Sequence, residues 1–118
     1  MQKLSEAEYE LATIIWQKQP IESGELAQIC EKQMGWKRST TYTLLKRMIE
    51  KEAAENTNTM VTMKLSKEEV DRENAEDLIQ KSYQGSLPMF IAAYTKGRKL
   101  SEEEAAELKI LIRRSEGR

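Results

Sequence analysis

The chain has 118 residues, of which 39% are hydrophobic and 33% are charged, a balance typical of a soluble, helix-rich protein with one modest core. It has no histidine, the commonest general base, and its single cysteine excludes an internal disulfide and the usual Cys/His zinc sites. No apolar run is long enough to span a membrane and residues 3–8 do not resemble a secretory signal. We therefore expect a cytoplasmic protein without a metal or cofactor, and no group of residues supports an enzyme.

Three segments carry the same signal for the start of a helix, a Leu-Ser pair with a glutamate three residues after the serine. The Ser/Glu pairs are Ser5/Glu8, Ser66/Glu69 and Ser101/Glu104. In such a capping box the serine hydroxyl accepts a hydrogen bond from a free amide of the first turn, and the glutamate accepts one from the serine amide. The pattern predicts helices that begin at these three serines.

The first two helices are expected over residues 5–17 and 22–33. The first has an apolar stripe that includes Leu11, Ile15 and Trp16, and we interpret Trp16 as a core residue. Pro20 ends it, and Ile21 could form a one-residue strand. The second helix buries Leu26, Ile29 and Cys30, and a turn at Gly35 follows it. Cys30 is interpreted as a small buried hydrophobic residue.

A third helix is expected over residues 38–52. At 100° per residue, Thr41, Leu44, Leu45 and Met48 share one narrow side, which we assign to the core. The opposite side then carries hydroxyls and cations, and Trp36 is expected to pack beneath the helix. The residues expected on or beside this outer face are Ser39, Thr40, Tyr42, Thr43, Lys46, Arg47 and Glu50.

Two short strands, residues 54–56 and 60–64, are expected to form a hairpin with a tight turn at residues 57–59. A hairpin after three helices is the element order of a winged helix-turn-helix domain. We therefore predict a mainly α protein with a small β-hairpin, in which residues 1–65 form a winged-helix domain.

The charge of the third helix points to DNA. The whole chain has a net charge of −1, but residues 35–51 contain five cations and one acid. A helix fits the major groove, where its first residues reach base edges, whereas Lys46, Arg47 and Lys51 are better placed for phosphates. The alternative is a winged protein-interaction module that does not bind DNA, which should have apolar or acidic residues on this face. The predicted DNA contacts are Lys37, Arg38, Ser39, Thr40, Tyr42, Thr43, Lys46, Arg47 and Lys51.

The remaining helices are expected over residues 66–83, from Ser86-Leu87-Pro88 onward, and over 101–114. They carry more apolar surface than their own core can bury, so residues 66–118 are predicted to form a helical dimerisation region. The alternative is that these helices fold back on the N-terminal domain. The predicted dimerisation residues are Leu78, Ile79, Leu87, Phe90, Ile91, Tyr94, Leu108, Leu111 and Ile112.

Nearly the whole chain resembles the penicillinase repressors of Gram-positive bacteria, which regulate β-lactamase and methicillin-resistance genes, and their copper-transport repressor branch. The resemblance rests on residues 4–8, Trp16, the run Gly35-Trp36-Lys37-Arg38-Ser39-Thr40-Thr41-Tyr42-Thr43-Leu44-Leu45-Lys46-Arg47-Met48, and residues 65–69, 85–94 and 100–104. It implies a homodimer that binds palindromic double-stranded operator DNA and blocks transcription. It also implies that Thr40, Thr43 and Arg47 occupy the DNA-facing positions of the family, with Lys37 and Tyr42 at variable ones.

Three departures from the family pattern bear on regulation. No cysteine follows Cys30, so the Cys-x-Cys copper site of the copper-responsive branch is excluded. Antibiotic-responsive members are cut by a membrane-anchored sensor protease at an Asn-Phe bond, where this chain has Ala93-Tyr94, which argues against that induction route. Glu52-Ala53-Ala54 stands in place of the usual Lys-Gly-apolar segment, so the wing is expected to contact DNA differently.

Overall fold

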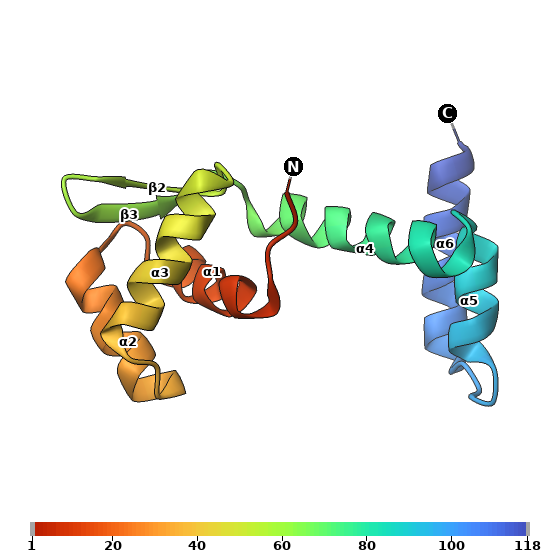
Figure 1. The fold of residues 1–118 in the computed structure, drawn as a ribbon. Helices are drawn as coiled ribbons and strands as arrows, with labels where there is room; N and C mark the ends of the chain where they lie inside the picture. Colours follow the sequence, from red (N-terminus) through yellow and green to blue (C-terminus); the bar gives the residue numbers. More distant parts are fainter. Residues whose placement is uncertain (1, 118) are drawn as a thin grey trace. The chain divides into compact units, whose positions relative to one another are not determined.

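A computed structural model describes residues 2–117, which form six helices and three short strands (Figure 1). The predicted fold class, mainly α with a small β-hairpin, is confirmed. The helices are α1 (Glu6–Lys18), α2 (Ser23–Met34), α3 (Arg38–Glu50), α4 (Lys67–Tyr83), α5 (Leu87–Thr95) and α6 (Glu102–Glu116), and the strands are β1 (Ile21–Glu22), β2 (Ala54–Thr57) and β3 (Met60–Met63).

The chain divides into two compact units, Met1–Ala75 and Glu76–Arg118, and the boundary falls inside α4. The first turns of α4 belong to the first unit, where the side chain of Val70 is completely buried. The two units are described separately below.

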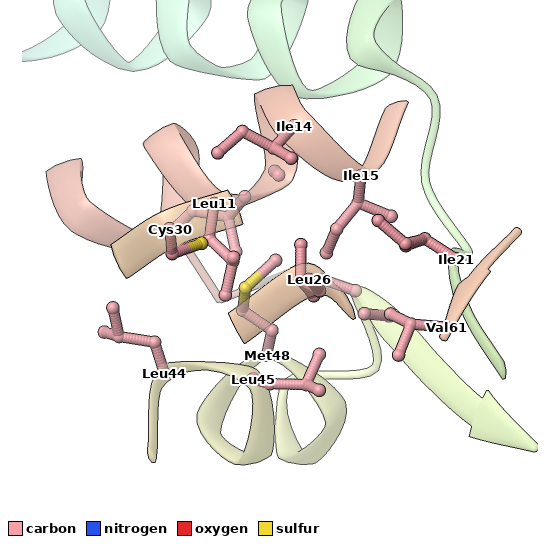
Figure 2. Packing of buried hydrophobic residues seen from close by; sticks show 14 of the residues in the cluster. Leu11, Ile14, Ile15, Ile21, Leu26, Cys30, Leu44, Leu45, Met48 and Val61 are labelled. Atoms are coloured by element: carbon pink, nitrogen blue, oxygen red, sulfur yellow. The ribbon is translucent and has the colours of Figure 1, made fainter. Parts of the chain in front are cut away.

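The core of the first unit is built by α1, α2, α3 and β3 (Figure 2). Its largest fully buried apolar side chains include Leu11, Ile15, Leu26 and Met48. On α3 the buried residues are Thr41, Leu44, Leu45 and Met48, the four that the helical spacing predicts. The Cys30 side chain is also fully buried, and this burial raises the pKa of its thiol.

The three strands form an antiparallel sheet in the order β1-β3-β2. Ile21 pairs with Val61 and Glu22 with Met60, so the expected one-residue strand is a two-residue one, and it pairs with the half of β3 that lies next to the turn. The Gln19 side chain continues this pairing, because its Oε1 accepts a hydrogen bond of 2.8 Å from the Met63 amide. The predicted three-residue turn is wrong: Thr57 pairs with Met60, and the turn consists of Asn58 and Thr59 alone, with φ of 52° and 67°.

All three predicted capping boxes are present. In each, the serine Oγ accepts a hydrogen bond of 3.0–3.1 Å from the amide of the glutamate three residues later. The glutamate Oε1 in turn accepts from the serine amide at 2.8 Å for Ser5, 3.0 Å for Ser66 and 3.5 Å for Ser101. The starts of α1, α4 and α6 are therefore determined locally by sequence.

Polar contacts attach the start of α4 to α1 within the first unit. The Trp16 indole Nε1 donates a hydrogen bond of 2.9 Å to the Leu65 carbonyl, and the Tyr9 hydroxyl donates one of 2.5 Å to Asp71. Trp16 is only half-buried, so its interpretation as a purely core residue is wrong. The indole N–H needs a polar partner, and the segment before α4 supplies it.

Helix α3 ends at Glu50, two residues earlier than predicted, in a left-handed turn. Glu52 has a φ of 62°, and the Ala53 amide donates a hydrogen bond of 2.9 Å to the Met48 carbonyl. This is the arrangement in which helices favour glycine after the last turn. Glu52 therefore occupies the position after α3 where helices favour glycine.

We expect the substitution Glu52→Gly to raise the free energy of unfolding by about 0.5–1 kcal/mol, because glycine adopts a positive φ without steric cost. The Glu52 side chain is exposed, so its loss removes no packing. Urea denaturation followed by circular dichroism measures the change. The matched control is Glu55→Gly inside β2, which should destabilise the protein; a lower stability of the Glu52→Gly variant would contradict the account.

The second unit contains the end of α4 together with α5 and α6. The Phe90 ring packs edge-on against Tyr83, with ring centroids 5.4 Å apart, and stacks on Tyr94 at 6.0 Å. The Arg98 guanidinium lies 4.8 Å from the centre of the Tyr94 ring. No residue of α5 or α6 that the structure describes is fully buried, so this unit has no closed core of its own.

Candidate nucleic-acid interface

The outer face of α3 is open to solvent and polar. Since the buried side of the helix contains every large aliphatic residue except Ile49, the solvent-facing side receives the hydroxyls and cations. The exposed residues at the start of and along this face are Lys37, Arg38, Ser39, Thr40, Tyr42, Thr43, Lys46, Arg47 and Glu50. These include every predicted DNA-contact residue except Lys51.

The beginning of α3 has no side-chain cap and no acidic residue in its first turn. Lys37 occupies the N-cap position, and its carbonyl accepts hydrogen bonds from the amides of Thr40 and Thr41. The free amides of the first turn and the positive end of the helix dipole therefore face outward beside two cationic side chains, Lys37 and Arg38. Such an end attracts phosphate groups.

A shallow hollow of about 280 Å³ lies along one side of the outer face. Its lining consists of three hydroxyl side chains, one aliphatic side chain and one guanidinium. Hydroxyls and a guanidinium can hydrogen-bond to base edges, and methyl groups can pack against the methyl group of thymine. The lining residues are Ser39, Thr40, Thr43, Leu44 and Arg47, so the three positions that the family resemblance singles out lie together.

The cations of this face are available to a ligand. Among residues 2–117, none of Lys37, Arg38, Lys46 and Arg47 has an acidic partner within ion-pair distance. Their charges are therefore not neutralised within the protein and can interact with phosphates.

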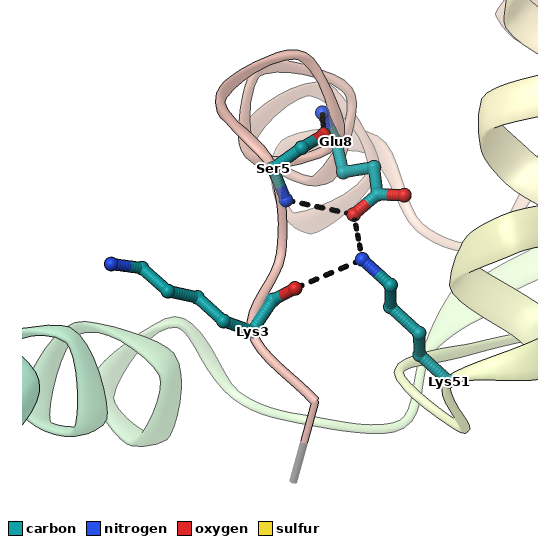
Figure 3. A network of polar contacts seen from close by, with 4 residues as sticks. All are labelled: Lys3, Ser5, Glu8 and Lys51. Atoms are coloured by element: carbon teal, nitrogen blue, oxygen red, sulfur yellow. Dashed lines mark hydrogen bonds and ion pairs between the residues drawn. The ribbon is translucent and has the colours of Figure 1, made fainter.

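Lys51 differs, because its ammonium group is already bound within the protein (Figure 3). Its Nζ donates a hydrogen bond of 2.5 Å to the Glu8 carboxylate and one of 2.9 Å to the Lys3 carbonyl. The Lys51 side chain is only 21% exposed. This network connects the end of α3 to the start of α1, so we leave Lys51 out of the DNA contacts that are proposed below.

The partner of Lys51 is a buried carboxylate. The Glu8 side chain is 2% exposed, and burial alone would raise its pKa. The hydrogen bond from Lys51, the hydrogen bond from the Ser5 amide and the positive charge of Lys51 outweigh burial and lower the pKa of Glu8 below its usual value. Glu8 is therefore ionised at neutral pH, and it depends on Lys51 for compensation.

The hairpin of β2 and β3 is uncharged at its tip. From Glu52 to Met63 the chain contains two acids and no lysine or arginine. The exposed tip residues are Asn56, Thr57, Asn58 and Thr59. Such a wing offers amide and hydroxyl groups for hydrogen bonds, and it has no cation for a phosphate.

Sequence reasoning did not single out two kinds of exposed apolar residue. Ile49 is 37% exposed on α3 and lies about two turns from Tyr42. Met89 and Ile110 are 46% and 48% exposed in the second unit. The spacing of Ile49 from Tyr42 is the signal that could have found it. For Met89 the helical pattern gives no such signal, because α5 is apolar nearly all round. Ile110 lies on α6, beside the apolar side that the spacing of Leu108, Leu111 and Ile112 predicts.

The second unit presents an apolar groove of about 500 Å³ between α5 and α6. It is lined chiefly by Leu87, Ile91, Leu108, Leu111 and Ile112. All five are predicted dimerisation residues, and of the other four, Leu78 and Tyr94 are exposed whereas Ile79 and Phe90 are half-buried.

Residues 2–117 contain no cluster of acidic or cysteine side chains that could hold a metal ion. None of the helices described is both long and apolar enough to cross a membrane.

Comparison with known proteins identifies the family. The family model described as penicillinase repressor matches residues 4–114, which is nearly the whole chain. No curated protein matches the chain. The match extends from α1 to α6, and so includes both the polar face of α3 and the apolar groove of the second unit. The chain therefore belongs to the penicillinase repressor family, whose members are DNA-binding transcriptional repressors and not enzymes.

Proposed function

We propose that this protein represses transcription by binding palindromic operator DNA as a homodimer, with α3 of each copy in the major groove. The observation that carries the proposal is the outer face of α3. It has a hollow lined by hydroxyls and Arg47, and four cations that have no acidic partner among residues 2–117. A winged protein-interaction module should instead have apolar or acidic residues on this face. Because a repressor acts where its DNA lies, the proposal includes a cytoplasmic location.

We propose that some residues of α3 contact base edges and that others contact the DNA backbone. Ser39, Thr40 and Thr43 lie in the first two turns of α3, which in helix-turn-helix proteins approach the bases. Lys37 and Arg38 accompany the free amides at the helix start, where phosphate binding is favoured. Lys46 and Arg47 follow one turn later, within reach of either the bases or the backbone.

The second copy is proposed to bind through the second unit. The groove between α5 and α6 is almost entirely apolar, and Leu111 and Ile112 at its side are 55% and 58% exposed. A monomer would leave these side chains in water, whereas two copies can bury them against each other. A two-fold dimer reads two half-sites about 34–36 Å apart, or a multiple of that distance.

We propose that residues 66–118 form the dimerisation region. The first turns of α4 also pack in the first unit. The sensor protease is not part of the proposal. Ala93 and Tyr94 lie within the helix α5, and a protease would need that segment extended. The inducing signal is therefore proposed to act by another route.

The test of DNA binding is the substitution Arg47→Ala. If Arg47 contacts a base, operator affinity should fall by about 1–3 kcal/mol, and if it contacts a phosphate, the slope of log K against log salt should fall by about one. Duplexes selected from fragments of the host genome serve as probes, titrated at two salt concentrations.

The control is Lys18→Ala, which removes an exposed cation from the last turn of α1. It changes the net charge equally but should leave both affinity and salt slope unchanged. Equal binding by the wild-type protein and the Arg47→Ala variant at both salt concentrations would remove Arg47 from the interface. Failure of the wild-type protein to select any duplex would refute the proposed function.

A further inference from the structure

One acidic residue, Glu50, lies on the cationic outer face of α3. Glu50 follows Thr43 by seven residues, which is about two helical turns, so both side chains leave the helix in nearly the same direction. Both are exposed. Helical side chains point back toward the N-terminus, which directs the Glu50 carboxylate toward the turn that contains Lys46 and Arg47. Glu50 therefore lies on the side of α3 that is proposed to face DNA, at its C-terminal end.

The stability of the protein does not explain this residue. Glu50 is the last residue of α3, where a negative charge opposes the negative end of the helix dipole. Lys46 precedes it by four residues, the less favourable order for an i,i+4 pair. Within the described part of the chain no ion pair or hydrogen bond from the Glu50 side chain is formed. A residue that costs stability on an exposed binding face points to a role in binding.

An ionised carboxylate has only acceptor oxygens. In the major groove it is matched by the amino group of cytosine or adenine, and it is repelled by the oxygen and nitrogen acceptors of guanine and by the oxygen of thymine. It is also repelled by phosphates. A carboxylate in this place therefore gives specificity by excluding wrong partners rather than by adding attraction.

We propose that Glu50 is a specificity-determining residue, which restricts one position of each operator half-site to a base that presents an amino group to α3. The inference rests on the proposed function, because it requires α3 to lie in the major groove. It concerns a position toward the end of each α3 contact, separate from the bases read by Thr40 and Thr43.

The variant that tests it is Glu50→Gln, which keeps the size of the side chain and replaces one acceptor oxygen by an amide donor. A randomised duplex library is used for selection with the wild-type protein and with the variant. The wild-type protein should select cytosine or adenine at one position per half-site. In the variant that preference should weaken by about tenfold or more, because a glutamine amide can both donate and accept. Preferences at the remaining positions should be retained.

The control is Glu10→Gln, which removes an equal charge from an exposed position on α1. It should reproduce the wild-type selection. Unchanged preferences in Glu50→Gln, or a gain in affinity that is the same for every duplex, would overturn the inference while the proposed function stands. If the wild-type protein selects no duplex at all, the proposed function fails and the inference fails with it.

Discussion

The substitution Leu111→Glu is expected to convert the protein to a monomer and to weaken operator binding by about 100-fold or more, because linking two half-site contacts multiplies affinity by about 10²–10⁴. Leu111 lines the groove of the second unit and is 55% exposed in the single chain. The substitution therefore empties no core and should leave the helical content unchanged. It places a charge where the partner copy would pack.

Analytical ultracentrifugation measures the mass, and gel-shift titration measures operator affinity. The matched control is Lys109→Glu, two residues away on α6, exposed and outside the lining of the groove. Although it changes the net charge by more than Leu111→Glu, it should remain dimeric and bind the operator normally. A Leu111→Glu variant that stays dimeric would show that another surface holds the copies together.

The second large effect concerns the ion pair at the end of α3. Lys51→Met keeps an unbranched side chain but removes the ammonium group, so the buried Glu8 carboxylate loses its cation. We expect the free energy of unfolding to fall by about 3 kcal/mol at neutral pH, the lower end of the range for a broken buried pair, since Lys51 is partly exposed. Lys46→Met is the control, and on an exposed face it should change stability by less than about 0.5 kcal/mol.

The loss should depend on pH in a defined direction. Because the folded protein lowers the pKa of Glu8, this residue stabilises the wild-type fold above its unfolded pKa of about 4.3, and that stabilisation is lost as the pH falls through the folded value. In Lys51→Met the buried Glu8 carboxylate has no cation and is protonated more readily. Lowering the pH should therefore remove the unpaired charge and reduce the loss of stability. The difference in stability, measured by urea unfolding, should therefore narrow from about pH 7 to about pH 4. A difference that is constant over this range would argue against the Glu8–Lys51 pair as its cause.

Much of the fold followed from local signals in the sequence. The three capping boxes and the four-residue core side of α3 appear as predicted, because each depends on residues within one or two turns of each other. The same spacing predicted the exposed face of α3. The polar hollow along it combines side chains from two adjacent turns, which a helical pattern can also bring together.

The differences arise from contacts between distant segments. Lys51 appeared to be a free cation, but Glu8 lies 43 residues away and reaches it only in the folded chain. The half-buried Trp16 donates a hydrogen bond to the carbonyl of Leu65, which lies 49 residues away, and periodicity cannot reveal such a contact. The turn was predicted one residue too long. A two-residue turn requires a positive φ at Thr59, and β-branched residues rarely adopt that conformation. Glu52, after the end of α3, is another non-glycine residue at positive φ.

The hydrogen bond from the Met63 amide to Gln19 protects part of a strand edge from pairing with another molecule. An unpaired strand edge is a template on which a second chain can add its own strand, and proteins suppress such addition by covering the edge. Strand β1 is too short to cover all of β3, and the Gln19 side chain occupies the next backbone donor beyond it. The Met63 amide, which β1 leaves uncovered, is thereby unavailable to an added strand. Addition of a strand to this part of β3 is therefore disfavoured.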